Sequence, residues 1–162
     1  METLTDEILR ICAYLSNKDN IHLSATSKRL SVIKFRIIFF TLTCIKDIIH
    51  LSYFHQFSNV IMLDTNESLP KHVTHLTFGY HFNQAIDSCI SDSVTHLTFG
   101  KFFNQPINGC IPDSVTNLTL GYSFDQNIDG LPILINNITL SGNYKRSISK
   151  KMLSKVTIRQ NI

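Results

Sequence analysis

The sequence predicts an α+β protein in which a short N-terminal helical segment precedes a parallel β-solenoid of about four to five coils. Three observations lead to this prediction. Sequence markers recur in phase over residues 69–148, each copy contains an alternating apolar–polar segment, and the first 40 residues do not share the repeat. We therefore expect the helical segment over residues 1–40, a connecting helix and capping strand over 41–68, and the solenoid over 69–162.

The repeat is defined by three markers that keep the same spacing. The heptapeptide Val73-Thr-His-Leu-Thr-Phe-Gly79 recurs in varied form, with copies that begin at Val94, Val115 and Ile135. The successive spacings are 21, 21 and 20 residues. An aromatic residue opens the second marker in every copy: Phe82, Phe103, Phe124 and Tyr144. The third marker precedes each copy and begins with an apolar residue: Leu69, Ile90, Ile111 and Leu131. Self-similarity at a fixed period of this length is typical of a solenoid.

Each coil is expected to contain one short strand and one sharp turn. Leu76-Thr77-Phe78 alternates apolar and polar residues around a β-branched centre, which is typical of a half-buried strand. A glycine follows the strand in the first three copies, where we expect a turn with positive φ: Gly79, Gly100 and Gly121. Because a unit of this length cannot close a core alone, stacked copies must bury their apolar residues against each other, with neighbouring strands in parallel.

Two rows of polar or small side chains recur with the repeat. Asn83, Asn104 and Asp125 follow the aromatic position, and we interpret them as a structural ladder that satisfies backbone groups at the bend, in preference to a ligand site. Cys89 and Cys110 share another position, where we expect small buried residues in preference to a disulfide.

A third row is expected on the outward side of the strands. His75 and His96 should stack there, with Asn117 next in the row. A metal site needs three or four converging ligands, and the third copy supplies only an amide, so no metal site is predicted. We interpret the row as a polar surface ladder, with contact to a partner as the alternative.

Two segments resemble the FNIP repeat, a divergent relative of the leucine-rich repeat: Phe103-Asn-Gln-Pro-Ile107 and Ile111-Pro-Asp-Ser-Val-Thr-Asn-Leu118. The resemblance covers roughly residues 69–148 and implies a curved parallel-sheet solenoid that binds other proteins. The last copy, at Tyr144, departs from the motif. The basic residues in and after it are interpreted as a soluble cap, with an acidic partner or nucleic acid as alternatives: Lys145, Arg146, Lys150, Lys151, Lys155 and Arg159.

The first 40 residues have a helical pattern instead of the coil pattern. Leu4, Ile8, Ile11 and Leu15 are spaced 4, 3 and 4 residues apart, which places them on one side of a helix. A turn is expected over residues 16–20, and a further helix begins after it. So short a segment cannot bury enough surface to fold alone, and must pack on the solenoid or on a second protein.

This segment resembles an F-box, although Thr5 replaces the family's usual proline and Asn20 its usual apolar residue. The matching residues, in order, are Leu4-Thr-Asp-Glu-Ile-Leu9, Ile11, Tyr14-Leu15, Asp19, Leu23 and Thr26-Ser-Lys-Arg-Leu30. An F-box joined to FNIP repeats resembles a family of amoebae and their large DNA viruses. The resemblance implies binding to the Skp-type adaptor of cullin–RING ubiquitin ligases through Leu4, Ile8, Leu9, Leu15 and Leu23. The alternative is that these helices only cap the N-terminal edge of the solenoid.

Residues 41–68 are expected to connect the two parts rigidly, because no glycine- or serine-rich linker lies between them. Ile45, Ile48, Ile49 and Ser52 have helical spacing, and residues 59–63 have the pattern of a strand. Within that strand we expect Ile61 and Leu63 to form an atypical first rung that covers the edge of the array.

Composition and motifs argue against several classes of function. The net charge of +3 is too small to indicate nucleic-acid binding, and no apolar stretch is long enough to span a membrane. Because the N-terminus is acidic and polar, unlike a secretory signal, we expect a cytoplasmic location, in a host cell if the source is viral. The sequence shows no catalytic motif and no repeated carboxylate row, so neither an enzyme nor a cofactor is predicted.

The combined prediction is a substrate-recognition adaptor of a Skp–cullin–F-box ubiquitin ligase. Its N-terminal segment would dock on the Skp-type adaptor, and its repeat face would bind an unknown protein substrate. The expected substrate contacts are His75, Thr77, Tyr80, His96, Thr98, Lys101, Asn117, Thr119 and Tyr122. The alternative is a non-enzymatic repeat scaffold for protein–protein interaction, with no link to ubiquitin.

Overall fold

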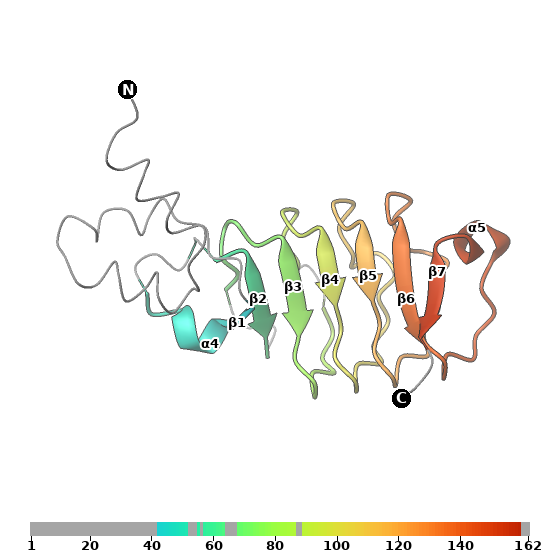
Figure 1. The fold of residues 1–162 in the computed structure, drawn as a ribbon, viewed down its shortest axis with the longest axis horizontal. Helices are drawn as coiled ribbons and strands as arrows, with labels where there is room; N and C mark the ends of the chain where they lie inside the picture. The colour runs from blue at the N-terminus through green and yellow to red at the C-terminus, as the bar shows by residue number, and fades with distance from the viewer. Residues whose placement is uncertain (1–41, 52–54, 56, 64–67, 87–88, 160–162) are drawn as a thin grey trace, which may run out of the picture.

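The computed structural model describes residues 42–51, 55, 57–63, 68–86 and 89–159. They form a seven-stranded parallel sheet whose strands follow one another in chain order (Figure 1). The strands are β1 (Thr43–Cys44), β2 (Asn59–Met62), β3 (His75–Phe78), β4 (His96–Thr98), β5 (Asn117–Thr119), β6 (Asn137–Ser141) and β7 (Val156–Arg159). The described helices are α4 (Ile45–Ile48) and α5 (Lys150–Leu153).

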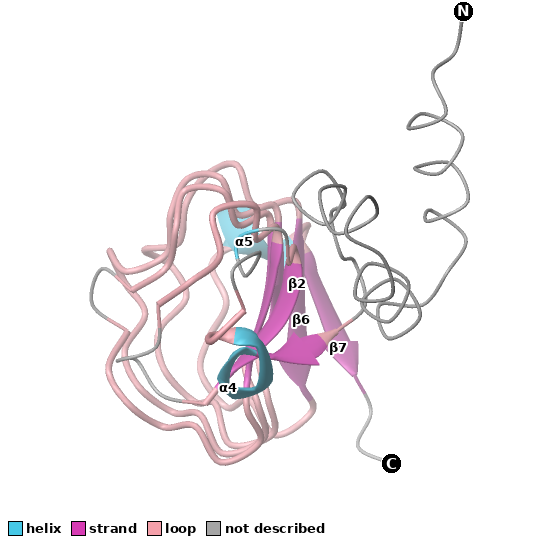
Figure 2. Cartoon of the chain, turned by 90° about the vertical axis from the view of Figure 1, so that its left-hand side faces the viewer, coloured by secondary structure: helices cyan, strands magenta, loops and turns pink. Residues whose placement is uncertain are grey.

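The described residues form a parallel β-solenoid of about five turns. Figure 2 shows that the strands make one wall of each coil and that loops complete the rest of it. The predicted solenoid is thereby confirmed. The F-box-like segment over residues 1–40, with its five expected adaptor contacts, lies outside the described residues.

Equal repeat positions lie directly opposite each other in neighbouring strands. Leu76 pairs with Leu97, and Leu97 pairs with Leu118. The same stacking holds on the far side of the coil, where the ring centroids of Phe82 and Phe103 are 6.0 Å apart and those of Phe103 and Phe124 are 6.2 Å apart. The expectation that identical side chains lie over one another in successive coils is confirmed.

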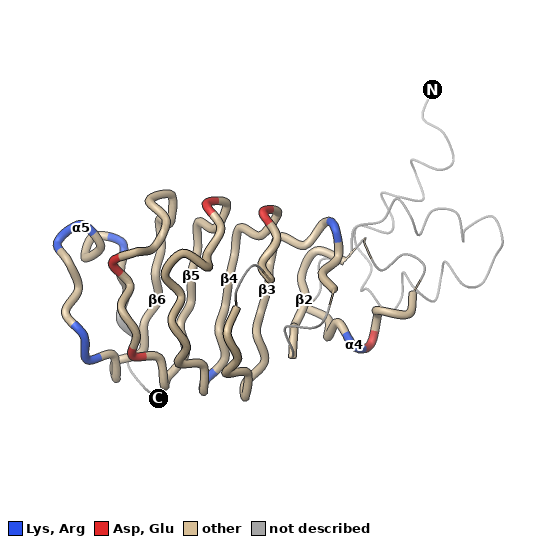
Figure 3. The backbone as a smooth tube through the Cα atoms, turned by 180° about the vertical axis from the view of Figure 1, so that it is seen from behind, with Lys and Arg blue, Asp and Glu red and all other residues tan. Residues whose placement is uncertain are grey.

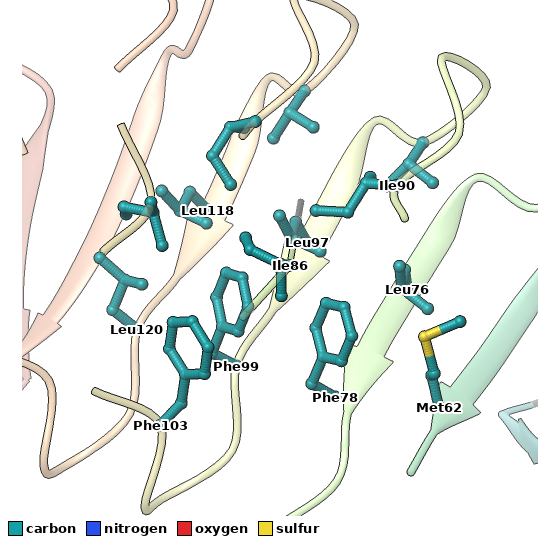
Figure 4. Close-up of a cluster of buried hydrophobic side chains, with 14 of the residues drawn as sticks. Met62, Leu76, Phe78, Ile86, Ile90, Leu97, Phe99, Phe103, Leu118 and Leu120 are labelled. Carbon is teal, nitrogen blue, oxygen red and sulfur yellow. The ribbon is translucent and has the colours of Figure 1, made fainter. Parts of the chain in front are cut away.

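The core runs through the middle of the coils and consists of repeated apolar rows. In each repeat from β3 to β6, the leucine or isoleucine of the strand and the phenylalanine or leucine two residues later face inward, where they meet the aromatic and isoleucine positions of the loops (Figure 4). The rings of Phe99 and Phe103, from the two sides of one coil, stack at 4.0 Å between centroids. Since all these rows are continuous, each inner coil is buried by the coil before it and the coil after it.

The three strand-ending glycines do not have the positive φ that we expected of them. Among the described glycines, Gly109 has that conformation, with φ of 77°. The strand-ending glycines are instead required by close packing between coils. A Cβ on Gly100 would lie 2.1 Å from the carbonyl oxygen of Gly79, and one on Gly121 would lie 2.1 Å from the carbonyl oxygen of Gly100. Glycine is therefore used here for close backbone approach.

The first rung also differs from the prediction. Val60 and Met62 face the core and are fully buried, whereas Ile61 is half-buried and Leu63 is exposed. The pairing of Val60 with Leu76 determines which residues point inward. An unbroken apolar run contains both alternating phases, so sequence alone could not choose between them.

The two ends of the sheet contain more structure than the sequence indicated. β1 pairs with β2, and β7 pairs with β6, so each end of the repeat array gains a strand. The predicted connecting helix is one short turn in which Ile45 and Ile48 are buried, while Ile49 is exposed. Ser52 lies outside the described residues. In the described part of the chain, no helix is long enough to cross a bilayer.

Replacing Gly100 by alanine should lower the free energy of unfolding by at least about 2 kcal/mol, because the new methyl group would overlap the backbone of the preceding coil. The matched control is Gly130→Ala, where the Cβ meets only the side chain of Asn108 and no backbone atom. It should cost less than about 1 kcal/mol. Urea unfolding of the full chain, followed by circular dichroism, measures both, and equal midpoints for the two variants would contradict this account of the packing.

Candidate protein-interaction surface

The outward side of the sheet carries six of the predicted contact residues. Because side chains alternate along a strand, the residues between the buried leucines and phenylalanines point to solvent. The pairing of β3, β4 and β5 brings these residues into two rows that cross the strands. We call them the strand face: His75, Thr77, His96, Thr98, Asn117 and Thr119.

One row of the strand face is a continuous chain of polar contacts. The imidazole rings of His75 and His96 stack with 4.1 Å between centroids and an angle of 11° between planes. Next in the row, Nδ2 of Asn117 lies 3.0 Å from Nε2 of His96. Nδ2 of Asn137 donates to Oδ1 of Asn117 at 2.9 Å. The row therefore crosses four strands.

These contacts indicate which ring nitrogen of His96 accepts a hydrogen bond and which one donates. Since Oδ1 of Asn117 accepts from Asn137, its Nδ2 must face His96, so Nε2 of His96 is an acceptor. The ring proton then lies on Nδ1, which is 2.9 Å from Oγ1 of Thr95. That hydroxyl donates in turn to the carbonyl oxygen of Thr74 at 3.2 Å. The row thus links the ring of His96, through the Thr95 hydroxyl, to the backbone of the preceding coil.

An aromatic cluster lies beside the strand face, just beyond the ends of β3, β4 and β5. Nζ of Lys101 lies 5.6 Å from the ring centroid of Tyr80, 5.4 Å from that of Tyr122 and 5.8 Å from that of Phe102. The rings of Tyr80 and Phe102 meet edge to face at 5.3 Å, and His81 stacks on Phe102 at 5.2 Å. The aromatic cluster is Tyr80, His81, Lys101, Phe102 and Tyr122.

The aromatic cluster is exposed although it is rich in apolar surface. Tyr80 is 54% exposed, Tyr122 48% and Phe102 42%. An open depression of about 580 Å³ adjoins the cluster, and its lining includes Leu63, Tyr80 and His81. Exposed aromatic side chains beside a concave surface are typical of sites that bind other proteins.

The sequence prediction included Tyr80, Lys101 and Tyr122 but missed His81 and Phe102. A usable signal was present, because Phe102 directly precedes the buried Phe103 and so must point away from the core. The three predicted residues occupy the same position in successive coils, which is why the structure brings them together.

Asn83, Asn104 and Asp125 bridge one coil to the next. Oδ1 of Asn83 accepts from the backbone N–H of Asn104 at 2.8 Å, and Oδ1 of Asn104 accepts from that of Asp125 at 2.9 Å. Oδ1 of Asp125 continues the row by accepting from the N–H of Lys145 at 3.1 Å. Gln126 adds a bond from Nε2 to Oδ1 of Asn104 at 3.0 Å. We call this row the bend ladder.

The described residues show no arrangement suited to metal chemistry. Across the described ranges, no group of three or more histidine, cysteine or acidic side chains converges. The described cysteines, Cys44, Cys89 and Cys110, form no disulfide with one another and are partly buried. The chemistry that the surface offers is hydrogen bonding from the strand face together with apolar and cation–π contact from the aromatic cluster.

The comparison with known families agrees with this geometry. Residues 65–102, 82–123 and 103–130 match the FNIP repeat model. These residues contain FNIP repeats, and we call residues 65–130 the FNIP array. Among solved structures, the chain is similar to one described as CroV588, a novel circular LRR protein structure, with a TM-score of 0.53 and 30% sequence identity. That match covers 65% of this chain and 17% of the other. The comparison with curated proteins gives no match.

Replacing Asn104 by alanine should lower the free energy of unfolding by about 1–3 kcal/mol, because the partly buried N–H of Asp125 loses its acceptor. Asn104→Asp keeps an acceptor oxygen, as Asp125 does in the next coil, and should cost less than about 1 kcal/mol. Urea unfolding separates the two variants. A similar loss in both would show that the bend ladder does not support the FNIP array.

The stability of the FNIP array should fall below neutral pH because of His75. Desolvation, and then the neighbouring His96, lower the pKa of His75 below its ordinary value of 6.5. The unfolded chain then binds more protons than the folded one, so the stabilisation is complete above about pH 6.5 and is lost as the pH falls toward the folded-state pKa.

The variant His75→Asn tests this, because asparagine occupies the same position at Asn117 and Asn137. Urea midpoints of the wild type should drop more between about pH 7.5 and pH 5.5 than those of the variant. Identical slopes would contradict the role of His75.

Proposed function

We propose that the chain is a protein-binding module that presents a bound protein to a Skp–cullin–F-box ubiquitin ligase. The repeat fold is suited to protein–protein interaction, and repeat solenoids are typical of non-enzymatic scaffolds. The observation that carries the proposal is the exposed aromatic cluster next to the strand face. Together they form a surface with apolar anchors at one edge and hydrogen-bonding groups beside them.

The two parts of this surface contribute differently to binding. Exposed tyrosine and phenylalanine rings supply most of the free energy when a partner covers them, since few residues dominate a typical interface. The strand face is polar and already hydrogen-bonded within itself, so it contributes selectivity more than affinity. Lys101 is held among aromatic rings and offers a cation to an acidic group of the partner.

The link to ubiquitin rests on the resemblance of residues 1–40 to an F-box. In this proposal Leu4, Ile8, Leu9, Leu15 and Leu23 contact the Skp-type adaptor. The chain then supplies proximity, because a protein bound to the solenoid is held near the ligase subunits that transfer ubiquitin. The division into an F-box-like segment, a connection over 41–68 and a solenoid over 69–162 belongs to the same proposal. So does a cytoplasmic location, in a host cell if the source is viral.

A second candidate function is a repeat scaffold that binds proteins without any connection to ubiquitin. It requires the same aromatic cluster and strand face, and it differs only in what residues 1–40 bind. In that case the N-terminal helices would cap the edge of the solenoid, which would otherwise expose a strand.

A pull-down with a purified Skp-type adaptor distinguishes these two functions. We expect the wild type to bind and Leu9→Asp to lose at least about tenfold in affinity, since a charge would enter an apolar contact. Ile133→Asp is the matched control, because Ile133 is 67% exposed in a loop before β6 and should tolerate a charge.

Tyr80→Ala combined with Tyr122→Ala should leave adaptor binding unchanged and abolish ubiquitin transfer to a captured substrate. If the wild type does not bind the adaptor, the chain is a scaffold only.

A further inference from the structure

Among the described residues, the core is incompletely covered at the C-terminal end of the solenoid. In the inner coils the aromatic and isoleucine positions are fully buried, as at Phe103 and Ile107. The equivalent residues of the last coil, Tyr144 and Ile148, are only partly buried, and so is Val156 of β7. Among the described residues, no further coil covers these three side chains, so they form an apolar rim at the end of the stack.

β7 also offers an unpaired backbone edge. It is the last strand of the sheet and pairs with β6 alone among the described strands. The carbonyl of Lys155 accepts from the N–H of Ile138 at 2.7 Å, so it faces β6. In a parallel ladder every second residue turns its N–H and C=O to the same neighbour. The backbone N–H and C=O groups of Thr157 and Arg159 therefore point toward β6. Those of Val156 and Ile158 face away from the sheet.

Positive charge is concentrated at this same end. Residues 130–162 contain six lysines and arginines and no acidic residue, whereas residues 41–129 contain three basic and eight acidic residues. Figure 3 shows the basic positions gathered around α5 and the last coil. Arg146 lies 4.0 Å from a carboxylate oxygen of Asp125, and Nζ of Lys155 donates to the carbonyl of Ile133 at 2.6 Å. Lys150 and Lys151 are exposed and form no ion pair within the described part of the chain.

From these three features we propose that the C-terminal end binds an extended acidic segment of another protein as an additional strand beside β7. The outward backbone groups of Val156 and Ile158 would continue the sheet. Alternate apolar side chains of the segment would cover Tyr144, Ile148 and Val156, and its carboxylates would meet Lys150 and Lys151. This site is separate from the strand face and the aromatic cluster, and it does not depend on the ligase proposal.

The charge distribution favours this occupant over the alternatives. Two copies of the chain meeting through β7 would bring two strongly positive ends together, and lysines near an edge strand oppose such pairing. A nucleic acid would satisfy the lysines but could neither continue the backbone ladder nor cover the apolar rim. An acidic peptide satisfies all three features together.

Fluorescence anisotropy of the full chain with a labelled peptide tests the proposal. The probe is a peptide of about ten residues in which glutamate alternates with valine or threonine, and it should bind with an affinity that falls with added salt. Lys150→Glu combined with Lys151→Glu should weaken it at least about tenfold. The matched control, Lys46→Glu combined with Lys71→Glu, makes the same charge change at exposed sites near the other end and should alter affinity less than about twofold.

A second pair of variants tests the added strand itself. Ile158→Pro removes an N–H that faces away from β6, so it should weaken the peptide at least about fivefold relative to Ile158→Ala, with an unfolding midpoint similar to that of Ile158→Ala. Ile158→Ala keeps that N–H and should retain binding.

Three results would overturn the proposal. The first is that an acidic peptide with proline at alternate positions binds as tightly as the probe. The second is that a single-stranded oligonucleotide binds this end more tightly than the peptide. The third is that the chain alone self-associates and that Ile158→Pro abolishes this association.

Discussion

This solenoid is held together by parallel pairing of each strand with the next. The register of this pairing places equal repeat positions opposite each other. Successive coils must approach closely for these bonds to form, which explains why a side chain cannot be accommodated at Gly100 or Gly121. The same register stacks the phenylalanine rings in the core and the asparagines of the bend ladder. One spacing between backbones therefore governs both the apolar and the polar rows.

The register also builds the candidate interaction surface. Side chains that are distant in sequence become neighbours because they share a position in the repeat, as His75 and His96 do on the strand face. Residue differences between copies then determine which chemical groups the surface presents. The residue after the strand-ending glycine is tyrosine in one coil, lysine in the next and tyrosine in the one after. This order produces the cation–π contacts of the aromatic cluster. A repeat protein can in this way change what it binds without changing its fold.

A stack of coils has two ends, and its ends differ from its middle. Inner coils bury their apolar rows completely, whereas the last described coil leaves Tyr144 and Ile148 partly exposed beside β7, the last of the described strands. The array becomes basic where this rim begins. Charge at an open end keeps like ends apart, and the same charge attracts an acidic strand. Protection against self-association and recognition of a partner thus have one physical origin.

The sequence alone determined the period, the parallel strands and the rows that stack, because a side chain repeated at a fixed interval has one consistent place in a coil. It did not determine the inward phase at Val60 and Met62, since an unbroken apolar run fits both faces of a strand. Nor did it reveal why the strand-ending glycines are needed, which depends on the distance to the preceding coil. The added strand β7 and the open rim beside it were likewise decided by tertiary structure, because both exist only through pairing with β6.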